Sequence, residues 1–159
     1  DEGWHQGIDI YFLSAVRPIR AVTPIFEAQG TGGSIINITT FATFEPDPAF
    51  PTSGVARAGL AAFTKLYADK YASQGIRINN LLPGGFDTER LRVTMQGAAA
   101  KTGRSFDELW AQRRDAVPAG RFGTPDEFGA FCAFVCSAHA GYLTGQNLLV
   151  DGGAYPGAF

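Results

Sequence analysis

Three short segments rich in branched apolar residues alternate with long helical patterns, and this alternation constrains the fold more than any other feature. The segments predict strands at 34–39 (SIINIT), 76–82 (IRINNLL) and 147–150 (NLLV). Glycines or a loop border each of them, which is typical of buried strands. Strands separated by helices need crossover connections. The order therefore predicts an α/β fold, a parallel sheet flanked by helices.

The helical patterns can be placed by their periodicity and by their start signals. Apolar residues recur at three- and four-residue steps over 4–26, which predicts the first helix. A loop with three prolines at 45–51 precedes a second helix over about 52–73. Ser105 and Thr124 are each followed by a glutamate three residues later, and this capping-box spacing predicts two more helix starts.

Composition limits the class of protein. The chain has 159 residues, of which 45% are hydrophobic, so one domain over 1–159 is expected. The formal net charge is −2 and the basic residues are scattered, which argues against a nucleic-acid partner. The longest strongly apolar run, 128–135, falls short of the roughly 20 residues that cross a bilayer. We therefore expect no membrane partner and a cytoplasmic location.

A metal site is not expected. Cys132, Cys136 and His139 share a helical pattern, but three ligands in an apolar run leave the coordination of a metal ion incomplete.

Five segments, in order along the chain, resemble the second half of a short-chain dehydrogenase/reductase. They are GGSIINITT (32–40), SGVARAGLAAFTK (53–65), GIRINNLLPGGFDTE (75–89), GRFGTPDEFGAFCAFVCS (120–137) and YLTGQNLLVDGG (142–153). The resemblance covers nearly the whole chain. It implies a Rossmann-like sheet that takes part in binding NAD or NADP, with an active site at the carboxyl ends of the strands.

The resemblance also implies four catalytic positions, and the chain departs from the family's pattern at every one. The family uses Asn, Ser, Tyr and Lys, and the spacing carries these onto Tyr11, Thr40, Ser53 and Arg57 respectively. Thr40 keeps a hydroxyl that can polarise a carbonyl. Arg57 keeps a positive charge and can hydrogen-bond a ribose or a substrate oxygen, but it cannot release a proton into a relay.

Ser53 is the most severe departure. Reduction of a carbonyl needs an acid that donates a proton as hydride arrives, and a tyrosine of pKa about 10 can serve when a cation lies nearby. A serine hydroxyl is much less acidic and normally needs a separate base, which Arg57 cannot be. Tyr11 is a candidate replacement for the proton donor, although packing between helices would also explain an aromatic residue there.

The turn PGGFDT, residues 83–88, matches the family's Pro-Gly-x-x-x-Thr pattern. The resemblance implies that Pro83, Gly84, Gly85 and the hydroxyl of Thr88 approach the nicotinamide, with glycine leaving room for a flat ring. A plain strand-to-helix turn is the simpler alternative. The family's glycine fingerprint has no counterpart here, so NAD or NADP is expected to bind only if a longer protein supplies an N-terminal half. We accordingly expect the chain to be a fragment or remnant of a longer protein.

Three functions remain open at this point. The first is an NAD(P)-dependent oxidoreductase with an atypical active site, acting on an unidentified carbonyl or alcohol of small-molecule size. The second is a non-catalytic binding or scaffold protein that has lost the chemistry. The third is similar to the halohydrin dehalogenases, which also carry arginine at the lysine position and need no nicotinamide, but which retain the tyrosine that this chain lacks.

A homodimer or homotetramer is expected from the same resemblance. The helices predicted over 4–26 and 52–73 correspond to the family's four-helix interface, and the segment 142–159 corresponds to a second interface.

Overall fold

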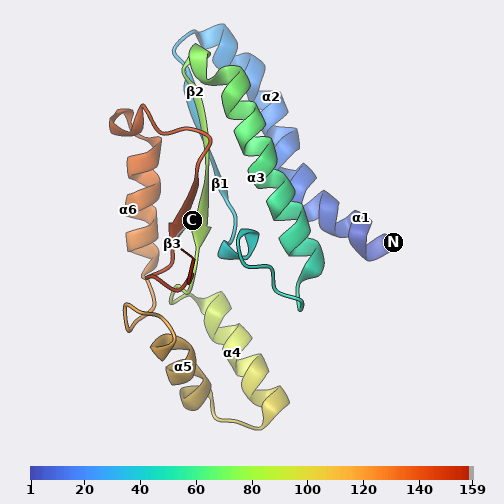
Figure 1. The fold of residues 1–159 in the computed structure, drawn as a ribbon, viewed down its shortest axis with the longest axis vertical. Coiled ribbons are helices and arrows are strands. Elements are labelled where there is room, and N and C mark those ends of the chain that lie inside the picture. The colour runs from blue at the N-terminus through green and yellow to red at the C-terminus, as the bar shows by residue number, and fades with distance from the viewer. Residues whose placement is uncertain (158–159) are drawn as a thin grey trace.

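The computed structural model describes residues 1–157, and its sheet has three parallel strands in the order β1–β2–β3 (Figure 1). The strands are β1, Gly33–Ile38; β2, Ile76–Pro83; and β3, Asn147–Val150. Both pairings are parallel. The predicted strands and the predicted parallel sheet are therefore confirmed.

Helices cover both faces of the sheet, with α2 and α3 on one side and α6 on the other (Figure 1). The covering helices are α2, Ser14–Gln29; α3, Pro51–Tyr71, which continues into a 3-10 turn at Ala72–Gln74; and α6, Pro125–Cys136, followed by a 3-10 turn at Ala138–Ala140. The first predicted helix is not uniform. It begins as α1, Glu2–Ile8, and passes through a π-helical turn, η1, at Asp9–Leu13 before α2.

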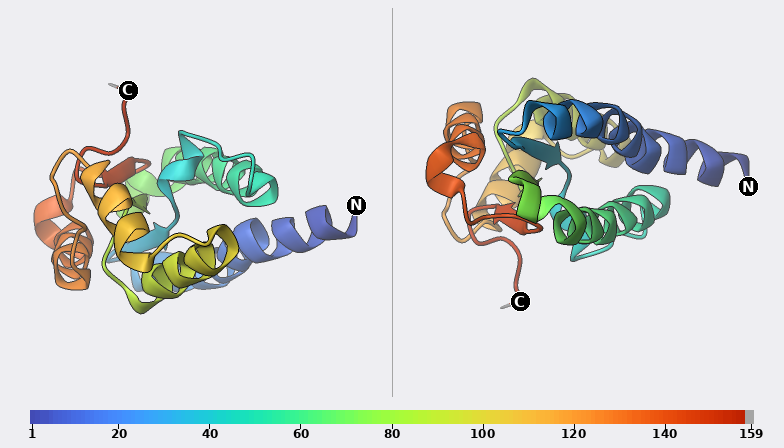
Figure 2. Two further views of the ribbon diagram at one scale, coloured as in Figure 1. Left: turned by 90° about the horizontal axis from the view of Figure 1, so that it is seen from below. Right: turned by 90° about the horizontal axis from the view of Figure 1, so that it is seen from above.

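Two shorter helices lie beyond the carboxyl ends of the strands (Figures 1 and 2). They are α4, Glu89–Thr102, and α5, Phe106–Asp115, which contact each other. The two predicted capping boxes are confirmed at the starts of α5 and α6: Ser105 and Glu108 form one, and Thr124 and Glu127 form the other. In each box the hydroxyl and the carboxylate satisfy amide groups that the first helical turn leaves without partners.

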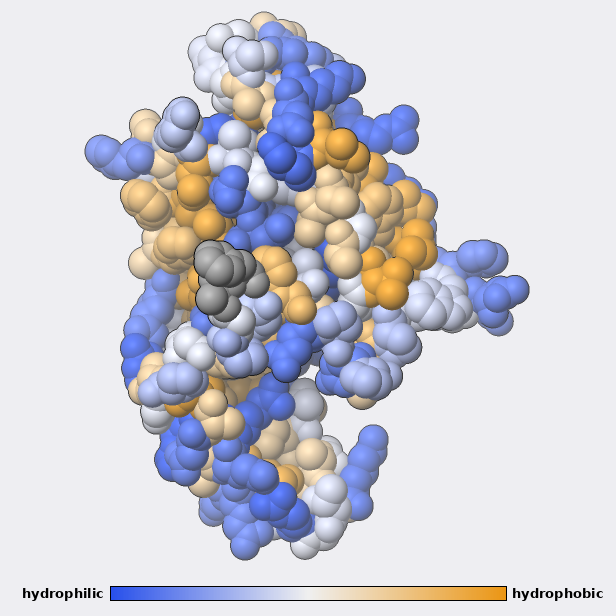
Figure 3. Space-filling model, in the orientation of Figure 1, coloured by the Kyte–Doolittle hydropathy of each residue, from blue (hydrophilic) through white to orange (hydrophobic). Residues whose placement is uncertain are grey.

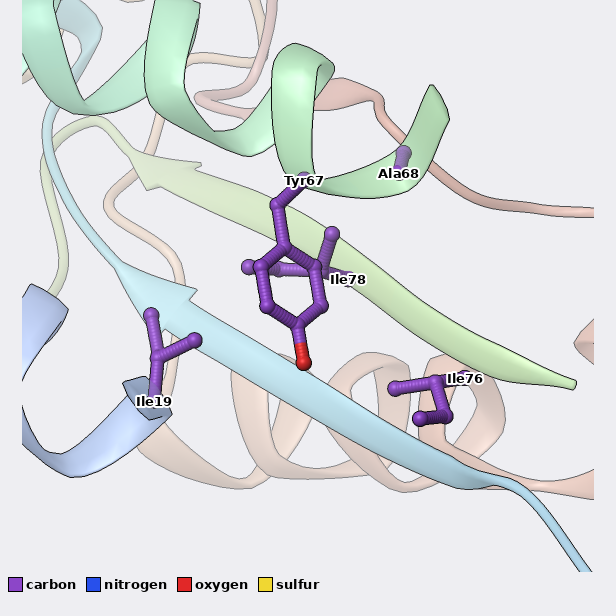
Figure 4. Close-up of a cluster of buried hydrophobic side chains, with 5 residues drawn as sticks. All are labelled: Ile19, Tyr67, Ala68, Ile76 and Ile78. Carbon is purple, nitrogen blue, oxygen red and sulfur yellow. The ribbon is translucent and has the colours of Figure 1, made fainter. Parts of the chain in front are cut away.

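The main hydrophobic cluster joins α2 and α3 to the middle strand. Tyr67 of α3 lies between Ile19 of α2 and the β2 residues Ile76 and Ile78 (Figure 4). Ile76 and Ile78 are fully buried, and a side chain of this kind contributes about 1.5–3 kcal/mol by leaving water. The Tyr67 hydroxyl pairs with that of Thr23 at 2.6 Å, so its polar atom is also satisfied within the cluster.

A row of asparagines crosses the sheet in register. Asn37, Asn80 and Asn147 are paired positions on β1, β2 and β3. Asn37 Nδ2 donates to Asn80 Oδ1 at 3.0 Å, and Asn80 Nδ2 donates to Asn147 Oδ1 at 2.7 Å. Thr64 of α3 adds a hydroxyl that donates to Asn80 Oδ1 at 3.0 Å. A one-residue slip would break all of these bonds, so the row fixes the register of the sheet.

Candidate active site

The carboxyl ends of the three strands meet at one edge of the sheet, because all three strands run in the same direction. There the segments that end β1 and β2 border a groove of about 530 Å³, which we call the strand-end groove, and Figure 3 shows the surface hollowed between the α4–α5 pair and the rest of the molecule. Such an edge is where open parallel sheets bind ligands. The groove is lined by Thr39, Thr40, Pro83, Gly84, Gly85, Phe86, Thr88, Arg90, Leu91, Thr94, Arg113, Pro125 and Phe128.

Thr40 is the second residue after β1 and is half-buried at the groove. Its backbone is extended, and its Oγ1 accepts a hydrogen bond from Ala42 N at 3.4 Å at the start of a 3-10 turn, Phe41–Thr43. A hydroxyl that accepts this bond keeps its own proton for donation. Thr40 is therefore equipped to donate a hydrogen bond to an oxygen in the groove.

The turn from Pro83 to Thr88 connects β2 to α4. Thr88 is the N-cap of α4, with its Oγ1 accepting from Leu91 N at 3.3 Å, and it also lines the strand-end groove. The structure thus brings Thr40 together with Pro83, Gly84, Gly85 and Thr88, the positions at which the resemblance implied cofactor contacts. The helix-capping role of Thr88 is the plain structural alternative, and it leaves the hydroxyl proton free for a ligand.

Gly84 has a different reason for being glycine from the one that the resemblance suggested. A Cβ added at Gly84 would lie 2.6 Å from the Cβ of Asp151, and one added at Gly85 would lie 3.0 Å from the Phe122 ring. Gly84 N also donates to Val150 O at 3.0 Å, which ties the turn to the end of β3. Glycine at position 84 is therefore explained by close backbone packing against Asp151, and no contact with a flat ring is needed to explain it.

Arg57 and Tyr11 form a second group. The Arg57 Cζ lies 5.1 Å from the centroid of the Tyr11 ring, within the range of a cation–π interaction. The guanidinium is half-buried, and its buried Nε has no hydrogen-bond partner among residues 1–157. Burial lowers the pKa of Arg57 from its ordinary value, and the nearby Tyr11 offsets part of that change.

Ser53 lies half-buried in the first turn of α3, one helical turn before Arg57. The start of α3 packs on the segment that follows Thr40, where a Cβ added at Gly54 would lie 3.9 Å from Ala42 O. Tyr11, Ser53 and Arg57 are not among the residues that line the strand-end groove. The predicted catalytic residues therefore fall into two neighbouring groups, with Thr40 in the groove and the other three around the start of α3.

Sequence reasoning missed three features of this region. One is the π-helical turn that carries Tyr11. Pro18, inside the same helical pattern, was the available indication that the helix is irregular. The other two are Arg90 and Arg113, which α4 and α5 bring to the groove. No spacing in the sequence relates these two arginines to Thr40, because their proximity depends on how α4 and α5 dock beyond the sheet.

The described residues contain neither a cluster of metal-ligating side chains nor a membrane-spanning helix. Within residues 1–157, no group of three or more His, Cys, Asp or Glu side chains is placed to hold a metal ion. No helix in this range combines the length and the apolar character that would let it cross a membrane.

Comparison with known proteins relates this chain to oxidoreductases. A family described as enoyl-(acyl carrier protein) reductase matches residues 1–155. Dehydrogenase/reductase SDR family member 4 from Homo sapiens is 29% identical over 153 residues, which cover 96% of this chain and 51% of that protein. The chain therefore spans about half the length of the curated relatives it matches.

Solved structures share the fold over almost the whole chain. L-sorbose reductase from Gluconobacter frateurii, complexed with NADPH and L-sorbose, aligns with a TM-score of 0.91 and 30% identity, covering 99% of this chain and 60% of that one. An NADPH-bound short-chain oxidoreductase from Pseudomonas aeruginosa, described as containing an atypical catalytic centre, aligns with a TM-score of 0.83 and 28% identity, covering 99% and 59%.

Proposed function

Because this chain belongs to the short-chain dehydrogenase/reductase family, we propose that it forms the substrate-binding half of an NAD(P)-dependent oxidoreductase acting on a carbonyl or alcohol. The observation that carries the proposal is the strand-end groove, where Thr40 and the Pro83–Thr88 turn face the same space. Support also comes from the relatives, since two matching structures are NADPH complexes of reductases.

The residues of the groove suit the binding of a carbonyl compound. In this proposal Thr40 donates a hydrogen bond to the carbonyl oxygen, because its Oγ1 already accepts from Ala42 N and its proton remains to be donated. Such a donor stabilises the negative charge that develops on the oxygen during reduction. Arg57 supplies a fixed positive charge beside this region, and its unpartnered Nε can donate to a ribose or substrate oxygen.

A nicotinamide cofactor fits what the structure offers on this side of the site. Thr88 retains a hydroxyl proton, the turn at Pro83–Gly85 lines the groove, and Arg57 Nε is a buried donor without an acceptor. When bound, the cofactor would supply or accept hydride. Nothing in the described residues distinguishes NAD from NADP, since the family's selecting residues lie in the half that this chain does not match.

A non-catalytic binding protein is the second candidate, and one observation favours it. Ser53 occupies the position of the family's proton donor. One turn later, Arg57 lies over the face of the Tyr11 ring. A proton relay needs a group that can release a proton, and a guanidinium cannot do so. Under this second candidate function the groove still binds a small molecule, but it performs no reduction. The Tyr11 hydroxyl is the candidate donor that would instead preserve activity.

The experiment uses the protein expressed from its complete coding sequence. Titration with NADH and with NADPH, followed by turnover assays with a panel of ketones and aldehydes, tests the oxidoreductase. Thr40→Val should lower turnover while leaving cofactor affinity unchanged, and Arg57→Ala should weaken cofactor or substrate binding. Cofactor binding without turnover of any carbonyl would favour the binding protein, and the absence of cofactor binding would defeat the oxidoreductase proposal.

We also propose a homodimer or homotetramer. Apolar residues are exposed on the helices that correspond to the family's interface: Ile25 of α2 is 56% exposed, and Val55 and Leu66 of α3 are 56% and 70% exposed. Figure 3 shows apolar side chains gathered on this side of the molecule. The corresponding C-terminal interface includes residues 158–159, which lie outside the described residues. Sedimentation at micromolar concentration tests the proposal, and a monomer would contradict it.

A further inference from the structure

The strand-end groove contains two arginines and no acidic residue. Arg90 of α4 and Arg113 of α5 both line it, and none of the other lining residues is an aspartate or a glutamate. Neither guanidinium takes part in an ion pair or a side-chain hydrogen bond within residues 1–157. The groove therefore has a positive wall whose charge the described part of the chain leaves unneutralised.

Other arginines on the same helices and turns are paired, which makes these two distinctive. Arg92 of α4 bonds Asp87 at 2.7 Å and lies over the Trp110 ring, with its Cζ 4.8 Å from the ring centroid. Arg114 of α5 bonds Asp115 at 2.7 Å. The paired and unpaired arginines alternate along each helix, and the unpaired ones are those that reach the groove.

The remainder of the groove wall is apolar or carries hydroxyls. Phe86 and Phe128 meet edge to face with their ring centroids 5.3 Å apart, and both line the groove beside Leu91. Thr40 and Thr88 contribute the hydroxyls already described. A ligand that matches this lining has an apolar body, an oxygen that accepts a hydrogen bond, and one anionic group.

We propose that the strand-end groove takes an anionic carbonyl substrate, a keto or aldehyde compound bearing a carboxylate or a similar oxyanion, with Arg90 and Arg113 binding the anion. Guanidinium groups bind carboxylates through parallel hydrogen bonds, and partial exclusion of water in a groove strengthens such bonds. The proposal rests on the proposed function for the reaction, but its binding step needs no turnover.

An adjacent cavity is consistent with this role for Arg113. It shares Arg113, Gly84 and Gly85 with the strand-end groove and also includes the acids Glu45 and Asp47. Asp47 Oδ1 accepts from Ala49 N at 2.8 Å, and neither acid is within ion-pair distance of Arg113. Arg113 thus borders both the strand-end groove and the loop that carries Glu45 and Asp47, and it is paired with neither acid.

The oxyanion could come from the substrate or from the diphosphate of the cofactor, so the experiment separates the two sources. Isothermal titration calorimetry of the complete protein compares 4-acetylbenzoate with 4-acetylbenzamide, which has the same shape and no charge. Pyruvate and pyruvamide form a second, smaller pair. NADPH is titrated into the same samples.

The variants are Arg90→Gln, Arg113→Gln and their combination. Arg114→Gln is the matched control, because it removes the same charge from the neighbouring position of α5, outside the groove.

We expect at least one acid to bind about tenfold more tightly than its amide, as charge-assisted hydrogen bonds to one guanidinium predict. Each groove variant should reduce that preference, the double variant should abolish it, and Arg114→Gln should keep it. NADPH affinity should be the same in every variant, and raising the salt concentration should weaken binding of the acids but not of the amides. Thermal unfolding of each variant identifies any that fails to fold.

Three results would overturn the proposal. The first is equal affinity for every acid and its amide, and the second is an acid preference that survives the double variant. The third is a loss of NADPH affinity equal to the loss for the acids, which would assign the arginines to the cofactor. Failure of the proposed function is distinguishable, since it appears as acid preference without turnover, whereas failure of this inference appears as turnover without acid preference.

Discussion

The guanidinium of Arg57 lies over the ring of Tyr11, with its Cζ 5.1 Å from the ring centroid. The two residues come from α3 and from the π-helical turn η1 that precedes α2. The resemblance to the family carries its lysine and its asparagine onto these two positions, and we propose that a cation stacked on an aromatic ring replaces the family's proton-relay pair in this chain. The contact holds the positive charge beside the start of α3, next to Ser53.

Removing the Tyr11 ring should destabilise the protein, whereas removing only its hydroxyl should not. Tyr11→Leu loses the contact with Arg57 and leaves a half-buried guanidinium with fewer partners, at a cost of about 1 kcal/mol. Tyr11→Phe keeps the ring and should unfold at nearly the same denaturant concentration as the wild type. Urea unfolding of both variants measures the difference. Equal loss in the two variants would mean that the hydroxyl, and not the ring, carries the stabilisation.

The same pair separates the two roles of Tyr11 in catalysis. If the native protein reduces a carbonyl and Tyr11→Phe abolishes turnover with the fold preserved, the hydroxyl is the proton donor. Turnover that Tyr11→Phe leaves intact would restrict Tyr11 to packing.

Replacing Arg77 should loosen the end of α6. Its guanidinium donates to four backbone oxygens, those of Val135, Cys136, Ser137 and Ala140, at 2.9 to 3.2 Å. These carbonyls lie at a helix C-terminus, where a cation also interacts favourably with the helix dipole. Arg77→Lys keeps the charge but loses the fork of donors, and we expect it to cost about 2 kcal/mol.

Arg104→Lys is the control for that measurement, because Arg104 is exposed and bonds only the Gln112 side chain, at 2.9 Å. Chemical denaturation should show little change for this variant. Hydrogen exchange should locate the loss in Arg77→Lys at α6 and β2. A uniform loss of protection over the whole chain would contradict the assignment.

Glu127 should make stability depend on pH at the acidic end. Hydrogen bonds from Arg121 and from Thr124 N lower the pKa of the Glu127 carboxyl to about 2. A lowered folded-state pKa stabilises the protein above the unfolded-state value of 4.5, and that contribution is lost as the pH falls through about 2. The carboxylate is exposed, so the effect should be small and should shrink further in salt.

Carbon-13 NMR titration of the Glu127 carboxyl measures the pKa directly. Glu127→Gln should lose less stability than the wild type on acidification from pH 5 to about pH 2. A Glu127 pKa near 4.5, or identical pH dependence of the two proteins, would refute the assignment.

The sequence allowed the sheet to be predicted because its indications are local. Branched apolar runs bounded by glycine located β1, β2 and β3, and Ser105 and Thr124 located two helix starts through a spacing that acts within one turn. The π-helical turn could not be located in this way, since proline indicates a disturbed helix without saying which turn changes. The asparagine row is also invisible in sequence, because Asn37, Asn80 and Asn147 become neighbours only through the register of three strands.

The residues of the candidate site likewise divide into those that could be predicted from the sequence and those that could not. The resemblance to the family supplied both Thr40 and the Pro83–Thr88 turn, and the structure brings them together because both follow parallel strands whose carboxyl ends lie at the same end of the sheet. Gly84 packs closely against Asp151, and this packing depends on the path of the chain after β3. Only the structure could therefore reveal it. Arg90 and Arg113 were missed for the same physical reason, because no pattern in the sequence indicates how α4 and α5 dock beyond the sheet.

The last prediction concerns the two positions onto which the resemblance places the family's tyrosine and lysine. Ser53→Tyr combined with Arg57→Lys restores the phenol and the ammonium that the family uses, on positions one turn apart on α3. A well-placed general acid typically contributes 10²- to 10⁴-fold, so the double variant of the complete protein should gain reductase activity on the order of 10²-fold. Arg57→Lys alone should gain little, because its ammonium would have no phenol to activate. Ser53→Tyr alone should gain less than the pair, because a guanidinium cannot pass on a proton.

Single-turnover reduction measures the chemical step, with thermal unfolding and NADPH titration confirming that each variant folds and binds. A double variant that binds NADPH and gains nothing would show that the surrounding frame no longer supports the chemistry. Strong native turnover that survives both Ser53→Ala and Thr40→Val would place the proton donor and the carbonyl-binding group elsewhere in the protein.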